Sequence, residues 1–318
     1  MKKSMMRAMC FVLGMIFWMG ILSAEPAGKD RFQVEIFGGA AYVDPQDFNL
    51  LSEAEEKYND VFFIQRLLYM EGYFVNDLPQ IRSTLPFGIR LKFLFSEKLS
   101  FSLCLEGFSR RAETSVEGTF RYVQPTWSEI LTKGYEPYRL ELSGYSILAG
   151  VHYRIPVGSR IDLEIGVAGG WAEADFTFSS TWSHRIRFLA EGYWDFSSVD
   201  GGTLEGQGSG NGFVAQAMIR LGQTVWRSFG FFVEGSGTFC RMGTIEGSGR
   251  EARIGIPGET SWEGTWGIKR EEVEMGAGSA SILVPTNFWE GWTGEQRERD
   301  FVLNLSGVRL LIGLYVRF

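Results

Sequence analysis

Charged side chains recur at every second position within several apolar stretches of this 318-residue chain. The clearest cases are Arg90 with Lys92, His152 with Arg154, and Asp162 with Glu164. Successive side chains of a strand point to opposite faces, so the members of each pair share one face. Opposite charges on facing strands attract one another. The spacing therefore predicts ion pairs between strands.

A turn centred on Gly158 would place Arg154 opposite Asp162 and His152 opposite Glu164, a base facing an acid in both cases. We expect the full set of inward charges to be Glu35, Arg90, Lys92, Glu106, His152, Arg154, Asp162, Glu164, Arg220, Glu234, Arg309 and Arg317. The interior of an eight-stranded barrel is just wide enough for side chains to fill it. Charges of both signs then predict a plug, and a pathway for ions or solutes is the alternative.

Nucleophilic chemistry would need a serine beside a histidine base. The chain has two histidines. His152 has an acidic partner in the scheme above, whereas His184 lies near Ser180 and Ser183 with no acid fixed beside it by the spacing. Cys104 and Cys240 fall at different heights on their strands, which predicts two separate buried thiols. We expect no enzyme, no catalytic residue, no metal site and no cofactor.

The first 24 residues resemble a secretory signal peptide. Lys2, Lys3 and Arg7 precede an apolar run that ends at Leu22, and small residues follow it. An uncleaved anchor is the alternative. No other stretch has the 18 or more apolar residues that a spanning helix needs. Residues 25–318 are then one exported domain, and the net charge of −7 argues against a nucleic-acid partner.

Alternating strands are predicted at 32–43, 85–95, 99–108, 138–155, 160–171, 212–222, 228–240 and 301–318. Short turns alternate with long connections at 44–84, 109–137, 172–211 and 241–300. This asymmetry is typical of a transmembrane, antiparallel, up-and-down β-barrel with long extracellular loops and both termini on the periplasmic side. The stretches 115–124 and 177–189 are alternatively further strands or tall hairpins. The predicted class is all-β, with about eight strands.

The chain ends in "GVRLLIGLYVRF", where Leu314, Val316 and Phe318 share one apolar face. Together with the strand and loop pattern, this ending resembles the small OmpA/OmpX-type outer-membrane β-barrels. The resemblance implies that Phe318, Val316 and Leu314 form the signal that the barrel-assembly machinery reads. It also implies a location in the cell outer membrane, with membrane lipid as a partner.

Two of the long connections carry further signals. In "LLSEAEEKYNDVFFIQRLLYMEGY", Ser52 and Glu55 have capping-box spacing. They predict a short helix that lies on the membrane or over the barrel mouth, or else packs against other loops. Trp262, Trp266, Trp289 and Trp292 in the last connection are candidates for contact with an unknown surface ligand, and a membrane-interface role is the alternative. The stretch "GGTLEGQGSGNG" at 201–212 is expected to be a mobile loop.

These features favour an integral outer-membrane barrel whose long loops serve a structural, adhesion or ligand-contact role. A narrow channel for ions or small hydrophobic solutes is the first alternative. A lipid-modifying enzyme is the second.

Overall fold

A computed structural model describes residues 31–67, 70–75, 77–124, 127–190, 194–226, 228–254, 258–275, 278–288 and 297–318. In this part of the chain, fourteen strands join one antiparallel sheet and one helix packs against it. The elements are β1 (Phe32–Val43), α2 (Gln46–Leu67), β2 (Glu71–Val75), β3 (Ser83–Leu94), β4 (Leu99–Gln124), β5 (Trp127–Pro156), β6 (Ile161–Ala190), β7 (Trp194–Trp226), β8 (Phe229–Met242), β9 (Glu246–Arg253), β10 (Glu259–Met275), β11 (Gly278–Phe288), β12 (Arg297–Asp300), β13 (Leu303–Asn304) and β14 (Gly307–Arg317). No helix in the described ranges is long and apolar enough to cross a membrane.

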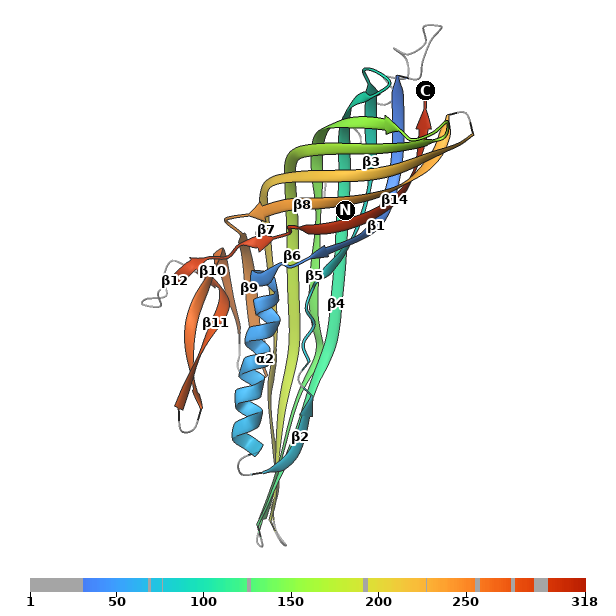
Figure 1. The fold of residues 1–318 in the computed structure, drawn as a ribbon. Helices are drawn as coiled ribbons and strands as arrows, with labels where there is room; N and C mark the ends of the chain where they lie inside the picture. Colours follow the sequence, from blue (N-terminus) through green and yellow to red (C-terminus); the bar gives the residue numbers. More distant parts are fainter. Residues whose placement is uncertain are drawn as a thin grey trace.

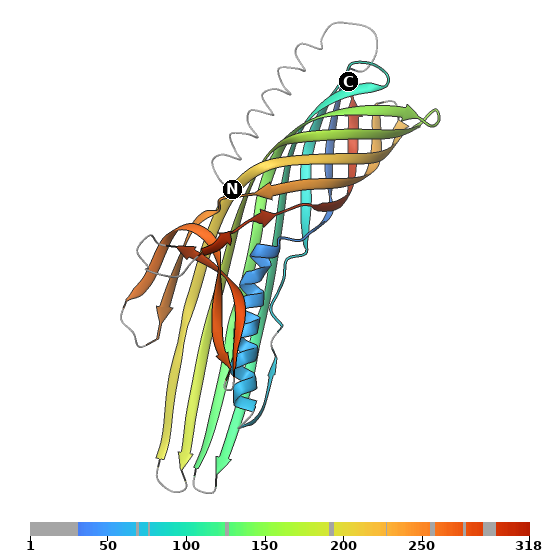
Figure 2. The ribbon, with the colours of Figure 1, turned by 60° about the vertical axis from the view of Figure 1, so that its left-hand side comes forward.

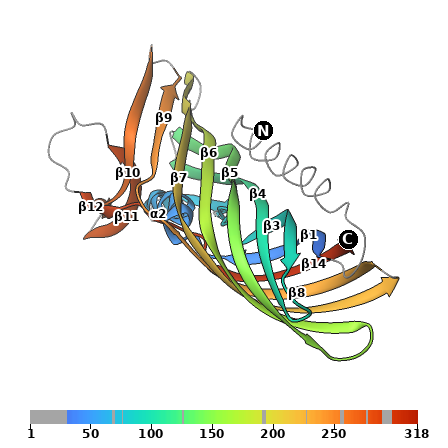
Figure 3. The same cartoon turned by 90° about the horizontal axis from the view of Figure 1, so that it is seen from above.

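Eight strands close into a ring (Figures 1 and 3). Their hydrogen-bonded order is β1, β3, β4, β5, β6, β7, β8 and β14, and β14 pairs with β1 to complete the ring. All eight pairings are antiparallel. The short connections at 95–98 and 157–160 lie at the same end of the ring as the C-terminus (Figure 1). The predicted all-β class, antiparallel pairing and eight-strand ring are confirmed.

The strands β4 to β7 continue well beyond the ring (Figure 2). The β4–β5 hairpin pairs as far as Gln124 and Trp127, and the β6–β7 hairpin as far as Ala190 and Trp194. At about 3.3 Å per residue, these hairpins reach on the order of 60 Å past the ring. We call this part, together with β2, α2 and β9 to β11, the extension. Long loops are expected at 109–137 and 172–211 from the sequence, and that expectation is wrong: both segments form the tall hairpins of the alternative.

Glycine composition misleads at 201–212, which is part of β7 and not a mobile loop. Gly206 and Gly208 lie on the inner face of the extension, beneath aromatic rings of β6. A Cβ atom on Gly208 would approach the ring of Phe176 to 2.6 Å, and one on Gly206 would overlap the ring of Phe178. The glycines therefore leave room for the rings to lie flat on the strand.

The inner face of the extension holds an aromatic core. Phe48 of α2 is fully buried against Phe176, with 5.1 Å between the ring centroids. Trp266 and Phe301 complete the cluster, 5.5 Å and 5.6 Å from the same Phe176 ring. The helix runs along this face (Figures 1 and 2). Burial of these rings, rather than the helix's own propensity, is what holds α2 in place.

The start of α2 differs from the prediction. The helix begins at Gln46, so Ser52 lies inside it, and the predicted cap at Ser52 is wrong. The Ser52 hydroxyl instead donates a hydrogen bond to the carbonyl of Pro79 at 2.6 Å. Asn49 exchanges two hydrogen bonds with the backbone of Ile81, at 2.9 Å and 3.0 Å. These polar residues tie the helix to the segment that leads into β3.

Candidate functional site

Glu35 is the centre of the charged ring interior. Its carboxylate lies 3.2 Å from both Arg90 Nη1 and Lys92 Nζ, and it accepts a hydrogen bond from Arg220. All four side chains are at most 3% exposed. Because Glu35 is on β1 and Arg220 is on β7, this contact crosses the ring between strands that are not neighbours.

Other ion pairs cross the ring in the same way. Arg90 of β3 donates to both carboxylate oxygens of Glu234 on β8, at 2.6 Å and 2.9 Å. Further bridges are Lys92 to Glu164, Arg309 to Glu106, and Arg317 to Asp162. Paired charges of this kind are the usual condition for burying ionised groups. With His152 and Arg154 of β5, which contact Glu164 and Asp162, these pairs draw on every strand of the ring. We call the whole set the charge network.

The register of the β5–β6 hairpin corrects one prediction. Arg154 lies opposite Glu164, and His152 lies opposite Gly166, so the Gly158-centred register is wrong. The expected partners still meet diagonally: Arg154 Nε is 3.8 Å from Asp162, and His152 Nδ1 is 3.0 Å from Glu164. A Cβ on Gly166 would approach His152 Nδ1 to 2.6 Å. The absence of a side chain at Gly166 thus leaves the space that the His152 imidazole occupies.

Ser102, His152 and Glu164 contact one another in the order nucleophile, base and acid of a serine hydrolase triad. Ser102 Oγ is 2.6 Å from His152 Nε2. Two features oppose catalysis. His152 Nδ1 is not aligned for a hydrogen bond to Glu164, and the three side chains are only 2%, 1% and 6% exposed. A substrate has no approach to this serine, and the group fits a structural role in the charge network.

A small cavity of about 40 Å³ lies inside the ring beside the Glu106–Arg309 pair. Residues of all eight ring strands line it, and Cys240 is among them. Glu106 Oε2 and Thr238 Oγ1 are buried there without a hydrogen-bond partner among the described atoms. A cavity of this size with polar walls can hold water. As predicted, Cys240 and Cys104 are buried and free.

Replacement of Thr238 by valine tests whether the cavity is occupied. If a guest such as water satisfies the hydroxyl, we expect Thr238→Val to lower the free energy of unfolding by about 1 kcal/mol, because a hydrogen bond is lost. In an empty cavity the same change would be neutral or stabilising, since it removes an unsatisfied buried group. Equilibrium unfolding in urea measures the sign. Thr203→Val on the exposed face of β7 controls for the change in side-chain shape.

The outer surface of the ring is apolar. Each ring strand presents at least one large apolar side chain that is about 40% or more exposed, among them Ile36, Phe87, Leu99, Val151, Val167, Ile219, Val233 and Ile312. An apolar belt of this extent is unusual in a water-soluble monomer.

The two faces of the long strands exchange character where the ring ends. On β6 the outer residues are Ile161, Leu163, Ile165, Val167 and Trp171 within the ring, then Glu173, Asp175, Thr177, Ser179 and Thr181 in the extension. The inner residues change from Asp162 and Glu164 to Ala172, Ala174, Phe176 and Phe178. The ring is apolar outside and charged inside, whereas the extension is polar outside and apolar inside.

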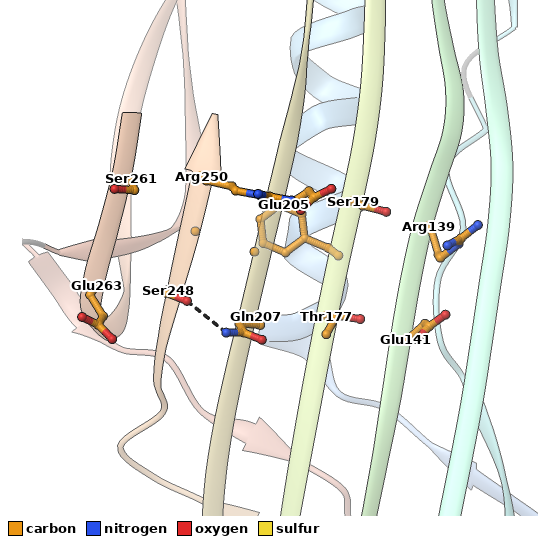
Figure 4. A pocket seen from close by; sticks show the side chains of 13 residues that line it. Arg139, Glu141, Thr177, Ser179, Glu205, Gln207, Ser248, Arg250, Ser261 and Glu263 are labelled. Carbon is orange, nitrogen blue, oxygen red and sulfur yellow. Dashed lines mark hydrogen bonds and ion pairs between the residues drawn. The ribbon is translucent and has the colours of Figure 1, made fainter. Parts of the chain in front are cut away.

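A polar groove of about 760 Å³ crosses the outer face of the extension (Figure 4). Two rows of side chains line it, and successive members of each row are cross-strand neighbours on β5, β6, β7, β9 and β10. The distal row is Arg139, Ser179, Glu205, Arg250 and Ser261, and the proximal row, nearer the ring, is Glu141, Thr177, Gln207, Ser248 and Glu263. Strands lie about 4.8 Å apart, so five of them give a groove roughly 19 Å long.

Several charges of the groove are paired with one another. Arg250 Nη2 lies 2.6 Å from Glu205, and the hydrogen bond to Glu205 raises the pKa of the Arg250 guanidinium. At the β5 end, Arg139 lies 3.4 Å from Glu113. Hydrogen bonds from Arg111 and Arg139 lower the pKa of the Glu113 carboxyl. These pairs therefore keep their charges across the neutral pH range.

Hydroxyl and amide groups fill the middle of the groove. Gln207 Nε2 donates to Ser248 Oγ at 3.1 Å, drawn as a dashed line in Figure 4. Arg139 Nε is buried without an acceptor among the described atoms. The sequence prediction missed this site because its residues were assigned to loops. The period-two alternation that continues through 173–181 was the available signal.

One of the four tryptophans predicted to contact a surface ligand, Trp266, is buried. Trp266 is 2% exposed, and its Nε1 donates to the Gln207 carbonyl from within the aromatic core. It is therefore a core residue, because β10 turns this side chain to the inner face. The side chains of Trp262 and His184 lie outside the described part of the chain, as do residues Trp289 and Trp292.

No protein-family model matches the chain. No curated protein matches it either. Among solved structures, the chain is similar to the outer membrane protein OprG from Pseudomonas aeruginosa at 10% identity, covering 92% of this chain and 98% of that one, with a TM-score of 0.32. The outer membrane protease OmpT from Escherichia coli follows at 9% identity, covering 93% and 99%, with a TM-score of 0.26. The toluene transporter TodX from P. putida is 6% identical, covering 92% and 91%, with a TM-score of 0.17. At these TM-scores, none of the three carries an argument about this chain.

Proposed function

We propose that the protein is an integral outer-membrane β-barrel that anchors a ligand-contacting extension at the cell surface. The observation that carries this proposal is the exchange of apolar and polar faces at the end of the ring. Lipid favours an apolar outer wall on a membrane barrel. It also favours a closed set of strands, because a closed ring leaves no unpaired backbone edge. Water favours the opposite arrangement, which the extension has.

The dimensions of the apolar belt agree with a bilayer. On β6 it runs from Ile161 to Trp171, eleven residues, and a spanning strand needs about 9 to 11. Exposed aromatic side chains mark both edges, as in the aromatic girdles of membrane barrels. Trp171 and Phe213 are on the extension side, and Trp226 and Phe318 are on the other.

The ends of the chain give the orientation that we propose. The C-terminus and the short turns would face the periplasm, and the extension would face the outside. The Phe318 amide donates to Phe32 at 2.8 Å, while the Phe318 ring is 64% exposed. Such an exposed terminal ring supports its role, with Val316 and Leu314, as the signal for the assembly machinery. Removal of residues 1–24 after export belongs to the same proposal.

The charge network supports an anchor rather than a channel. Long side chains of both signs bridge the ring from strand to strand, and the cavity beside them has room for only a few small molecules. The groove on the extension is open to solvent and lined by charged, hydroxyl and amide side chains. We therefore propose that contact takes place there and not in the lumen.

Gel mobility tests the barrel. Protein folded into detergent micelles should migrate differently before and after boiling, and its circular dichroism should be β-rich before boiling. A chain that stays soluble without detergent and shows no boiling-dependent shift would contradict the proposal. It would mean that the apolar belt meets another protein surface instead of lipid.

A further inference from the structure

We infer that the polar groove binds a neutral, hydroxyl-rich glycan chain laid across the strands. This inference rests on the proposed function and names the ligand class of its contact site. Thr177, Ser179, Ser248 and Ser261 offer hydroxyls that both donate and accept, and the Gln207 amide does the same. A polyol presents the same mixture of donors and acceptors, so it can pair with both rows.

The shape of the groove suits an extended chain. The two rows are two residues apart on each strand, which makes the floor roughly 7 Å wide and 19 Å long. That footprint accommodates a linear chain several sugar units long. A peptide that adds a strand would need an open sheet edge. The groove instead lies on a face, with β6, β7 and β9 hydrogen-bonded on both sides.

The charges disfavour an anionic ligand. Glu205 with Arg250, and Glu113 with Arg139, satisfy one another and leave no excess of cations. The lining residues include three glutamates and two arginines, so an anionic polymer or nucleic acid would meet net repulsion.

The position of the groove brings it close to the saccharides of its own membrane. Thr177 lies six residues past Trp171 on β6, on the order of 15 to 20 Å above the edge of the apolar belt. In the proposed orientation, sugars attached to outer-leaflet lipids occupy this level. Soluble glycans from outside are the second source of the same chemistry, and the experiment separates the two.

Surface plasmon resonance on the full chain in detergent micelles tests the inference. The probes are dextran, the delipidated polysaccharide of a Gram-negative lipopolysaccharide chosen for an uncharged repeat and freed of its charged core, and heparin as an anionic comparison. We expect binding to dextran or the delipidated polysaccharide that changes little between about 50 and 500 mM NaCl. Thr177→Val and Ser248→Ala should each weaken it about fivefold, the effect of one lost hydrogen bond. Thr181→Val, on the same face of the same strand but outside the groove, should leave it unchanged.

The outcomes separate the two proposals. Preference for the delipidated polysaccharide would indicate that the ligand is a sugar chain on lipids of the same leaflet. Preference for dextran would indicate a soluble glycan from outside the cell. Both results support the groove as a glycan site. Binding to neither, or salt-sensitive binding to heparin alone, would overturn the inference. Binding that neither substitution weakens would also overturn it. In each case a retained gel shift on boiling shows that the barrel proposal stands.

Discussion

Replacing Glu35 with glutamine should lower the free energy of unfolding by about 3 to 5 kcal/mol, because it leaves buried cations uncompensated. Arg90 keeps Glu234 and Lys92 keeps Glu164, but Arg220 loses the carboxylate to which it donates. Glutamine preserves the shape of the side chain, so the loss reports on charge and not on packing. Urea unfolding of the protein in lipid vesicles, followed by tryptophan fluorescence, measures it.

The control for this experiment is an ion pair in water. Glu113 contacts Arg111 and Arg139 on the outer face of the extension, where such pairs contribute little. Glu113→Gln should therefore leave the unfolding midpoint unchanged. Adding Arg220→Leu to Glu35→Gln should recover part of the lost stability, since it removes the stranded charge. A Glu35→Gln protein as stable as the parent would show that the network is not what holds the ring closed.

The ring could be predicted from the sequence because its signal is local. Period-two alternation assigns each residue to a face, and short turns fix the neighbours, so the eight strands and their antiparallel order follow. The ring closure through β1 and β14 also follows from an even number of strands. The register of the β5–β6 hairpin could not be predicted, because it depends on which residues of the turn form hydrogen bonds. Arg154 faces Glu164 and not Asp162, a shift of two positions.

The extension could not be predicted with the same rules. Its strands keep their alternation, but the apolar residues pass from the outer to the inner face at Trp171, and glycines such as Gly206 interrupt the inner pattern. The pattern typical of a membrane strand, with apolar residues on the outer face, therefore ends at Trp171. The start of α2 was also predicted wrongly. The Ser52 hydroxyl donates to the Pro79 carbonyl, a tertiary contact that capping-box spacing does not reveal.

The groove was hidden for a further reason. Its rows combine residues of five strands, from Arg139 on β5 to Ser261 on β10, and only the register of the sheet aligns them. No one segment carries a motif. By contrast, the charge network was visible within single strands, because each inward charge is flanked by outward apolar residues.

Replacing Ile312 with arginine should destabilise the folded protein in a bilayer by about 2 to 4 kcal/mol, the cost of a charge at the membrane midplane. Ile312 lies in the middle of β14, between Gly38 of β1 and Val233 of β8, and is 62% exposed. An exposed isoleucine in water would tolerate arginine within about 0.5 kcal/mol. The same substitution therefore gives different results in the two solvents. Unfolding in phospholipid vesicles and the yield of protein in the outer-membrane fraction both report it.

Thr181→Arg is the matched comparison, because Thr181 is exposed on the outer face of β6 beyond the exchange of faces. It should leave both stability and yield unchanged. The pair of variants thus maps the boundary between lipid and water along the strands. If Ile312→Arg is as harmless as Thr181→Arg, the belt does not meet lipid, and the exchange of faces at Trp171 marks a contact with another protein surface.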